Sequence, residues 1–302
     1  MNEPNGILIV NKHSGVTSHD IVGKARRLFG TRRVGHTGTL DPMASGVLVV
    51  LIGRAAKAAE YLVADSKEYR AILRLGLTTD TEDSTGTILT QTDRLPTAQE
   101  VIKTCEGLVG EIVQIPPMYS ALKKNGQKLC DLARQGIVVE REARPVTIHR
   151  LECTPAERES DYILEVKCSS GTYIRTLCAD IGKSLGCGGV MASLERTRAG
   201  GFSLGEAYTA AELETMTEEQ RMSCLIPTER LFDGLVAVRL PEFFERLGRS
   251  GCELYQKKLH TSFALGERMR ICTQNGRFFA LGEVRNYPDG SAIKIIKIFD
   301  LL

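Results

Sequence analysis

The sequence predicts an α+β fold with two domains, and three observations lead to this expectation. The chain has 302 residues, enough for two domains of roughly 100–200 residues each. Hydrophobic residues make up 42% and charged residues 25%, the balance of a globular protein with a sizeable core. Strand-like and helix-like segments follow one another without the regular strand–helix–strand period of a doubly wound parallel sheet.

Four segments in the first two thirds of the chain have the pattern of β-strands. Ile7–Lys12 and Val47–Ile52 are continuous apolar runs of strand length. Glu68–Gly76 and Tyr162–Cys168 alternate, so that in the first of these every second residue from Tyr69 lies on one face. These segments predict a sheet with a buried face.

Helices are predicted by start signals followed by apolar stripes. Ser18 precedes an apolar stripe that begins at Ile21, and Thr97 is followed three residues later by Glu100, the pattern of a capping box. Thr209 and Glu212 repeat that pattern. A further stripe has the spacing of a buried helix face and consists of Ile174, Leu177, Cys178, Ile181 and Leu185.

The pattern changes near Pro227. Beyond it, Arg268–Thr273 and Phe278–Val284 flank an Asn-Gly turn and predict a β-hairpin, which the strand-like Ser291–Phe299 follows. Twelve basic and nine acidic residues lie between 229 and 302. We expect a small β-rich domain of about seventy residues here.

The net charge of +2 conceals segments of opposite sign. Residues 20–36 carry five basic residues and one acidic residue, and residues 120–150 carry seven and three. Residues 80–111 carry two basic and seven acidic residues. A single charged run is most often a solvated face, but two basic segments of equal excess favour one shared anionic partner.

Several function classes lose their usual evidence. The start of the chain has an apolar run of only four residues, and no stretch approaches the ~18 apolar residues of a membrane helix, so we expect a soluble, cytoplasmic protein. The nine cysteines never form a C-x-x-C pair, which favours reduced, mostly buried thiols. Nucleotide-binding and zinc-protease motifs are absent, and the acidic turn at 80–86 lacks calcium-loop spacing. No cofactor or metal is expected.

The segment from Gly35 to Gly46, GHTGTLDPMASG, is the best candidate for chemistry. Its three glycines predict an irregular loop before the strand Val47–Ile52, and such a loop can aim the Asp41 carboxylate into a cleft. The residues alone leave an equal alternative, in which Asp41 only organises the turn before Pro42.

This loop closely resembles the signature around the catalytic aspartate of the TruB-type pseudouridine synthases of bacteria, and other segments are similar to family motifs in the same order. They include Ile9–Ser18, Lys67–Arg70, Thr79–Asp83, Ile115–Lys124, Ala143–Val146, Gly171–Leu177 and Leu194–Thr197. The resemblance covers about the first two hundred residues. The tail resembles the small PUA-type domain that many such enzymes carry.

The resemblance implies a pseudouridine synthase fold, with a mixed, largely antiparallel central sheet flanked by helices, and a PUA-like RNA-binding domain. The expected boundaries are 1–228 and 229–302, with an RNA-clamping insertion at about 120–150. The implied reaction isomerises uridine 55 in the TΨC arm of tRNA to pseudouridine by base flipping, without a cofactor or an obligatory protein partner, in a monomer. The alternatives are a non-catalytic tRNA-binding protein or chaperone of the same fold, and a synthase acting on another RNA.

The resemblance also assigns roles to single residues. Asp41 matches the catalytic aspartate, Arg175 the arginine that pairs with it, and Tyr69 the tyrosine that stacks on the target uracil. Tyr173 and Leu194 match walls of the uracil pocket. From the residues alone, Tyr69 and both wall residues would be ordinary core residues.

The remaining candidates are expected to bind RNA. His36 matches the histidine that fills the vacated base stack, and Lys12 matches a lysine near the active site. Phosphate contacts are expected from the two basic segments. The residues expected to make these contacts are Arg32, Arg33, Lys123, Lys124 and Lys128.

Overall fold

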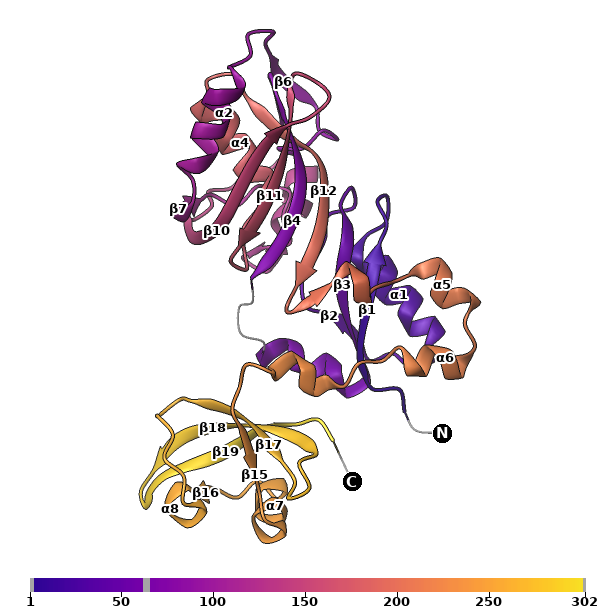
Figure 1. The fold of residues 1–302 in the computed structure, drawn as a ribbon, viewed down its shortest axis with the longest axis vertical. Coiled ribbons are helices and arrows are strands. Elements are labelled where there is room, and N and C mark those ends of the chain that lie inside the picture. Colours follow the sequence, from indigo (N-terminus) through magenta and orange to yellow (C-terminus); the bar gives the residue numbers. More distant parts are fainter. Residues whose placement is uncertain (1–2, 62–65, 301–302) are drawn as a thin grey trace.

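The computed structural model describes residues 3–61 and 66–300, and within them it contains a ten-stranded sheet and a separate five-stranded sheet (Figure 1). The strands of the large sheet, in spatial order, are β14 (Tyr208–Thr209), β1 (Gly6–Lys12), β3 (Ser45–Ile52), β12 (Gly189–Ala199), β4 (Lys67–Leu75), β11 (Asp161–Cys168), β10 (Arg144–Pro155) and β7 (Gly110–Gln114). In addition, β2 (Val34–His36) pairs with β3, and β13 (Phe202–Ser203) pairs with β12.

Pairing in this sheet is mainly antiparallel, and the parallel pairs are β1 with β14 and β3 with β12. The four predicted strands are β1, β3, β4 and β11. On β4, the alternating residues from Tyr69 to Leu75 are at most 7% exposed, so the predicted inward face is confirmed. The α+β class and the mixed, largely antiparallel sheet are likewise confirmed.

Helices cover the sheet in two groups. The helices α2 (Ala98–Glu106) and α4 (Ile174–Ser184) lie on the half formed by β4, β10, β11 and β12, whereas α1 (Ser18–Leu28), α5 (Ala210–Thr215) and α6 (Glu218–Ser223) lie beside β1 to β3 (Figure 1). The capping boxes at Thr97 and Thr209 form as predicted. No helix in the described part of the chain is long and apolar enough to span a membrane.

The start of α1 differs from the sequence prediction by one residue. Thr17, not Ser18, caps the helix, because Thr17 and Asp20 exchange the two hydrogen bonds of a capping box. The Ser18 side chain turns inward instead and bonds to Leu40. The apolar stripe that begins at Ile21 does not show which residue caps the helix, because both Ser and Thr are good N-caps.

The five-stranded sheet near the C-terminus confirms the predicted hairpin. Its strands, in spatial order, are β15 (Ala237–Arg239), β17 (Arg268–Cys272), β18 (Phe278–Tyr287), β19 (Gly290–Ile298) and β16 (Leu254–Tyr255). The helices α7 (Glu242–Arg249) and α8 (Gln256–Leu259) pack beside it. This unit is the PUA-like domain, and it has a hydrophobic core of its own.

Two 3₁₀ segments, η1 (Gly53–Tyr61) and η3 (Thr228–Phe232), lie where the two sheets meet. A small apolar cluster of Ala58, Phe232, Leu281 and Phe299 joins the units there. The boundary expected at 228/229 falls within η3. A third short 3₁₀ turn, η2 (Leu204–Glu206), follows β13.

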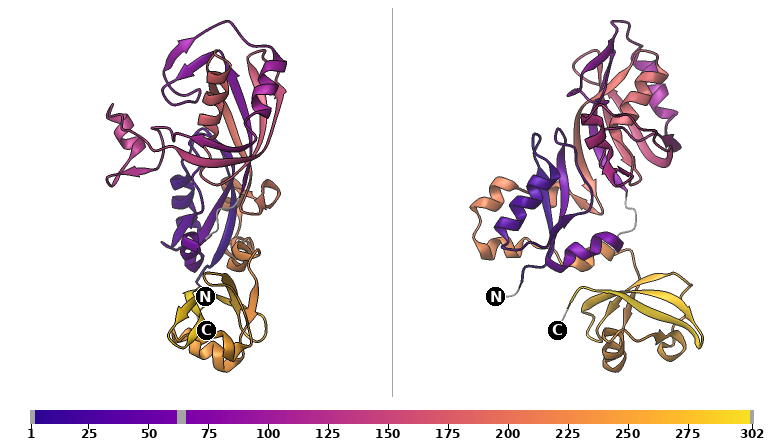
Figure 2. Two further views of the ribbon diagram at one scale, coloured as in Figure 1. Left: turned by 90° about the vertical axis from the view of Figure 1, so that its left-hand side faces the viewer. Right: turned by 180° about the vertical axis from the view of Figure 1, so that it is seen from behind.

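The segment after β7 projects from the body as an arm, which we define as residues 120–143 (Figure 2, left). It holds a hairpin of β8 (Lys123–Lys124) and β9 (Gln127–Lys128), followed by α3 (Leu129–Arg134). Residues 144–150, which the sequence grouped with this insertion, belong to β10 of the central sheet. A further hairpin, β5 (Leu77–Thr79) with β6 (Ile88–Gln91), flanks the turn at 80–86.

The nine cysteines are free, as expected. Five of them are buried, and Cys252 is exposed.

Candidate active site

Asp41 lies in a loop between β2 and β3, and we call residues 37–44 the Asp41 loop. Backbone groups on both sides of the carboxylate are held in place. Ser18 Oγ donates to the Leu40 carbonyl at 3.0 Å and accepts from the Leu40 N–H at 2.8 Å. The Gly15 N–H donates to the Pro42 carbonyl at 2.8 Å. The loop is therefore irregular, as predicted, but firmly braced.

Lys12, at the end of β1, also holds the Asp41 loop through a hydrogen bond to Pro42. Its side chain is completely buried, and Nζ donates to the carbonyls of Val16 at 2.9 Å, His13 at 3.1 Å and Pro42 at 3.3 Å. Burial lowers the pKa of the Lys12 ammonium to about 8, although Asp41 opposes that shift. The geometry thus makes Lys12 a support for the loop, and the predicted contact with substrate stays a prediction.

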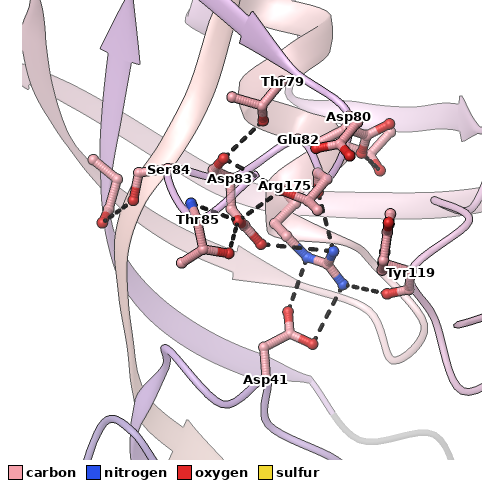
Figure 3. Close-up of polar contacts among 12 residues, drawn as sticks. Asp41, Thr79, Asp80, Glu82, Asp83, Ser84, Thr85, Tyr119 and Arg175 are labelled. Carbon is pink, nitrogen blue, oxygen red and sulfur yellow. Dashed lines mark hydrogen bonds and ion pairs between the residues drawn. The ribbon is translucent and has the colours of Figure 1, made fainter. Parts of the chain in front are cut away.

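Arg175, in the first turn of α4, grips Asp41 with two nitrogen atoms (Figure 3). Nε lies 2.9 Å from Oδ2, and Nη2 lies 3.3 Å from Oδ1. The Arg175 side chain is 5% exposed, whereas that of Asp41 is 34% exposed. A two-point charge-assisted pair fixes the plane of the carboxylate while leaving it open on one side.

The terminal nitrogen atoms of Arg175 make further contacts away from Asp41 (Figure 3). Nη2 donates to the Tyr119 carbonyl at 2.7 Å, and Nη1 donates to the Thr81 carbonyl at 3.1 Å. Nη1 also lies 3.8 Å from the buried Asp83 carboxylate. Because Tyr119 directly precedes the arm, one guanidinium joins the Asp41 loop, the acidic turn and the base of the arm.

Asp83 organises the acidic turn that surrounds Arg175. Its Oδ1 accepts from Thr81 Oγ1 at 2.8 Å, from the Thr85 N–H at 3.0 Å and from Thr85 Oγ1 at 2.6 Å. These bonds turn the other carboxylate oxygen toward Arg175. The turn thus serves as an arginine clamp.

The electrostatics of the site favour a reactive carboxylate. Burial raises the pKa of Asp41 above its ordinary value, and Asp83 adds to this, whereas Arg175 and Lys12 oppose it. A partly desolvated carboxylate that is kept ionised by a neighbouring arginine has the character of a nucleophile or base.

Tyr69, the predicted stacking residue, and Leu194, a predicted wall of the uracil pocket, lie on the adjacent strands β4 and β12. Tyr69 on β4 is 7% exposed, and its cross-strand partner on β12 is Arg196. Leu194 lies two residues before Arg196 on β12 and is 8% exposed. Burial raises the pKa of Tyr69, and the charge of Asp41 acts in the same direction.

Tyr173, the other predicted wall residue, directly precedes α4. Its backbone is fixed by Gln114, which accepts from the Tyr173 N–H at 3.0 Å and donates to the Tyr173 carbonyl at 3.2 Å. Burial raises the pKa of its phenol, so the group is neutral near pH 7. The structure therefore brings Asp41, Arg175, Tyr69 and Tyr173 together.

His36 ends β2, one residue before the Asp41 loop. Burial lowers the pKa of its imidazole, which favours the neutral ring. Its Nδ1 atom is buried and has no hydrogen-bond partner within the described residues. A neutral ring is suited to stacking between bases, the role that the family resemblance implies.

The predicted phosphate contacts fall in two separate places. Lys123, Lys124 and Lys128 are exposed on the arm, where Lys123 and Lys128 lie directly opposite each other. Arg32 and Arg33 lie beside the far end of β3, since the Gly53 N–H donates to the Arg33 carbonyl. β3 has eight residues, so this end is more than about 20 Å from its start beside Asp41. The structure does not join these arginines to the Asp41–Arg175 pair.

Sequence reasoning missed Asp83, the Tyr119 carbonyl and the side chains of Ser18 and Arg196. Thr79–Asp83 and Leu194–Thr197 were singled out as motifs, but no role was given to Asp83 or Arg196. A carbonyl acceptor leaves no trace in residue identity. The signal for Asp83 was the run of Thr and Asp around it, which is typical of a self-bonded turn.

The fold places the chain among pseudouridine synthase-like structures. It superposes on a chain of the structure described as a Cbf5-Nop10-Gar1 complex with a TM-score of 0.75 and 25% identity, covering 98% of this chain and 85% of that one. An archaeal box H/ACA sRNP Nop10-Cbf5 complex gives a TM-score of 0.70 at 23% identity, covering 99% and 87%, and supports the fold alone.

Family models assign the chain more narrowly. Residues 26–174 match the N-terminal domain of the TruB family pseudouridylate synthases, and residues 175–233 match the C-terminal domain of tRNA pseudouridylate synthase B. A tRNA pseudouridine synthase B of Clostridium perfringens is 41% identical over 92% of this chain and 95% of its own length. The tRNA pseudouridine synthase B of Clostridium tetani is 39% identical over 97% of this chain and 99% of its own length. The chain belongs to the TruB family of pseudouridylate synthases, which are isomerases.

Proposed function

We propose that this protein converts uridine 55 in the T-arm of tRNA to pseudouridine. The observation that carries the proposal is the Asp41–Arg175 pair, a two-point-held carboxylate that is one third exposed beside two tyrosines. The tRNA substrate is supported by curated relatives of 39–47% identity that are named tRNA pseudouridine synthase B.

The proposed reaction needs no external atom or electron. The bond from ribose to uracil N1 breaks, the base turns, and the ribose is joined to C5, whose proton is lost while N1 gains one. Asp41 acts as nucleophile or base in the cleavage step, and Arg175 fixes the orientation and charge of its carboxylate. Tyr69, Tyr173 and Leu194 enclose the uracil.

The target base must leave the folded T-arm to reach Asp41. His36 fills the place that the base vacates. Lys123, Lys124 and Lys128 hold the phosphates through the arm, and the pairing of Lys123 opposite Lys128 supports this role. Like charges directly opposite on a hairpin are unfavourable unless an anion lies between them. Lys12, Arg32 and Arg33 add support and phosphate contacts outside the pocket.

We further propose that residues 1–228 form the catalytic domain and that 229–302 form an RNA-binding domain. The protein works as a monomer in the cytoplasm, where its tRNA substrate is found. The separate hydrophobic cores of the two sheets support this division.

The proposal is tested by incubating purified protein with an unmodified tRNA transcript and no cofactor, followed by nucleoside analysis and mapping of the modified position. We expect one pseudouridine per tRNA, at position 55. A transcript with cytidine at that position is the control. Binding without pseudouridine would favour a non-catalytic RNA-binding protein, and modification elsewhere would favour another substrate.

A further inference from the structure

Arg196 is among the largest fully buried side chains of the described residues, at 1% exposure, and no role has yet been given to it. It lies on β12. Nε donates to the Val47 carbonyl at 2.8 Å, Nη2 to the Gly38 carbonyl at 3.0 Å and Nη1 to the Thr39 carbonyl at 3.3 Å. Two of these three acceptors belong to the Asp41 loop.

The same residue also neighbours Tyr69. Arg196 and Tyr69 are directly paired across β12 and β4, so their side chains lie next to each other on one face of the sheet, and the arginine lowers the pKa of the phenol. Arg196 therefore holds the backbone just before Asp41 from a position next to Tyr69. Gly46 permits this close packing, because a Cβ atom there would overlap the Arg196 backbone.

The surroundings of Arg196 are unusual for a structural arginine. Within residues 3–61 and 66–300 no carboxylate forms an ion pair with it, and its side-chain hydrogen bonds go to the carbonyls of Val47, Gly38 and Thr39. A buried cation without an acidic partner is costly, and a chain that needed only packing would be served by an apolar residue. The charge itself is therefore the feature to explain.

A guanidinium has donors only, so the phenol oxygen of Tyr69 must be the acceptor in any hydrogen bond between the two groups. The phenolic hydrogen then points away from Arg196. A negative charge that develops on the phenol oxygen during proton transfer would be stabilised by the adjacent cation.

We propose that Arg196 is a positioning residue that fixes the Tyr69 hydroxyl relative to the Asp41 carboxylate and stabilises negative charge on Tyr69. This inference rests on the proposed function for the roles of Asp41 and Tyr69. It assigns Arg196 no contact with the nucleotide.

The charged and titratable groups around Tyr69 make the inference measurable. Burial raises the pKa of Tyr69, and Cys168 on β11 and Asp41 raise it further, whereas Arg196 on β12 lowers it. Replacing Arg196 with a neutral residue removes the charge that lowers this pKa, so we expect the pKa of Tyr69 to rise.

The test follows Tyr69 in the RNA-free protein labelled with 3-fluorotyrosine, by fluorine NMR, with the resonance assigned through Tyr69→Phe. We expect Arg196→Gln to raise the titration midpoint of Tyr69 by about one pH unit or more, and Arg196→Lys to raise it less. Arg198→Gln, an exposed arginine on the same strand, is the matched control and should leave the midpoint unchanged. An unchanged midpoint in Arg196→Gln would overturn the proposal.

Turnover gives a second readout. Arg196→Lys should lower kcat by about 10–100-fold with KM within about threefold, because a small misplacement of reacting groups is costly. In a Tyr69→Phe background the same substitution should lower the remaining kcat much less. Equal losses in both backgrounds would show that Arg196 does not act through Tyr69.

Should Arg196→Gln fail to fold, the wild-type arginine side chain decides the question. The Arg196 Nη resonances, observed by nitrogen-15 NMR, should shift in Tyr69→Phe, and an absence of any shift would contradict the contact. These spectra require no RNA. A wild-type protein that makes no pseudouridine would therefore refute the proposed function while leaving the Arg196–Tyr69 contact tested.

Discussion

The Asp41 loop and the arm are two parts of one proposed RNA site, yet they are built in opposite ways. In the loop, Ser18, Lys12 and Arg196 hold the backbone on both sides of Asp41. In the arm, the lysines are exposed, and α3 lacks a side-chain hydrogen bond at its N-cap. Leu129 and Leu132 of α3 are buried, and Arg141 Nη1 ties the arm to the Pro116 carbonyl at 3.1 Å.

The difference reflects what each part is proposed to do. A carboxylate that attacks or deprotonates must be held in one position, because misplacement by about 1 Å can cost 10²-fold in rate. Phosphate binding depends mainly on charge, which tolerates small displacements of the lysines. Substitutions in the loop should therefore change the rate, and substitutions in the arm should change the affinity.

The largest effect is expected at Asp41. Asp41→Asn keeps the size of the side chain but removes its charge, and it should lower kcat by at least about 10⁴-fold. Binding of tRNA, measured by filter retention, should change by less than about threefold. If this variant retained substantial turnover, Asp41 would not be the reacting group.

Replacement of Arg175 should have the next largest effect. Arg175→Lys keeps a charge but loses the two-point grip, and we expect kcat to fall by about 10²–10³-fold. In Arg175→Gln the pKa of Asp41 should rise, because Arg175 lowers it in the wild type. The carboxylate would then protonate at higher pH, so the acid limb of the kcat profile should move to higher pH. A limb that stayed in place would separate Arg175 from the ionisation of Asp41.

The arm should respond in affinity. Lys123→Gln with Lys128→Gln should weaken tRNA binding by about tenfold near 0.1 M salt and reduce the slope of log affinity against log salt by about 1.5. The paired control is Lys103→Gln with Lys183→Gln, two exposed lysines on α2 and α4. An equal loss of affinity in both pairs would show that tRNA binding depends on the overall charge of the protein and not on the lysines of the arm.

The smallest expected effect compares two neighbouring residues. Ser18→Ala leaves the buried Leu40 N–H without its partner, so it should cost about 1–3 kcal/mol of unfolding free energy and lower kcat several-fold. Thr17→Ala removes the cap of α1 and should cost about 1 kcal/mol without affecting kcat. Urea unfolding and turnover measured on the same preparations distinguish the two. Equal kcat in both variants would mean that turnover does not depend on the hydrogen bonds between Ser18 and Leu40.

The sequence predicted local features well where a pattern repeats. The strands β1, β3, β4 and β11 follow apolar or alternating patterns, and the helix starts at Thr97 and Thr209 follow their capping boxes. The Asp41 loop was identified by its glycines and its resemblance to a known family.

The sequence did not predict the contacts between segments that are distant in the chain. Arg196 bonds to carbonyls some 150 residues earlier in the chain, and any residue type would provide the same carbonyl. Ser18 and Thr17 are both favourable caps by sequence, and only the structure shows that Thr17 caps the helix while Ser18 bonds to Leu40. The resemblance pointed to Lys12 as a substrate contact, whereas its burial could be seen only in three dimensions.

The most direct test of this division is the single-turnover rate of pseudouridine formation as a function of tRNA concentration, measured for Asp41→Asn and for the Lys123→Gln, Lys128→Gln pair. We predict that Asp41→Asn abolishes most of the rate at saturating tRNA. Its tRNA affinity, measured by filter retention, should stay unchanged. The lysine pair should reach the wild-type saturating rate at about tenfold higher tRNA concentration. A lysine pair whose saturating rate fell with unchanged half-saturation would contradict the account.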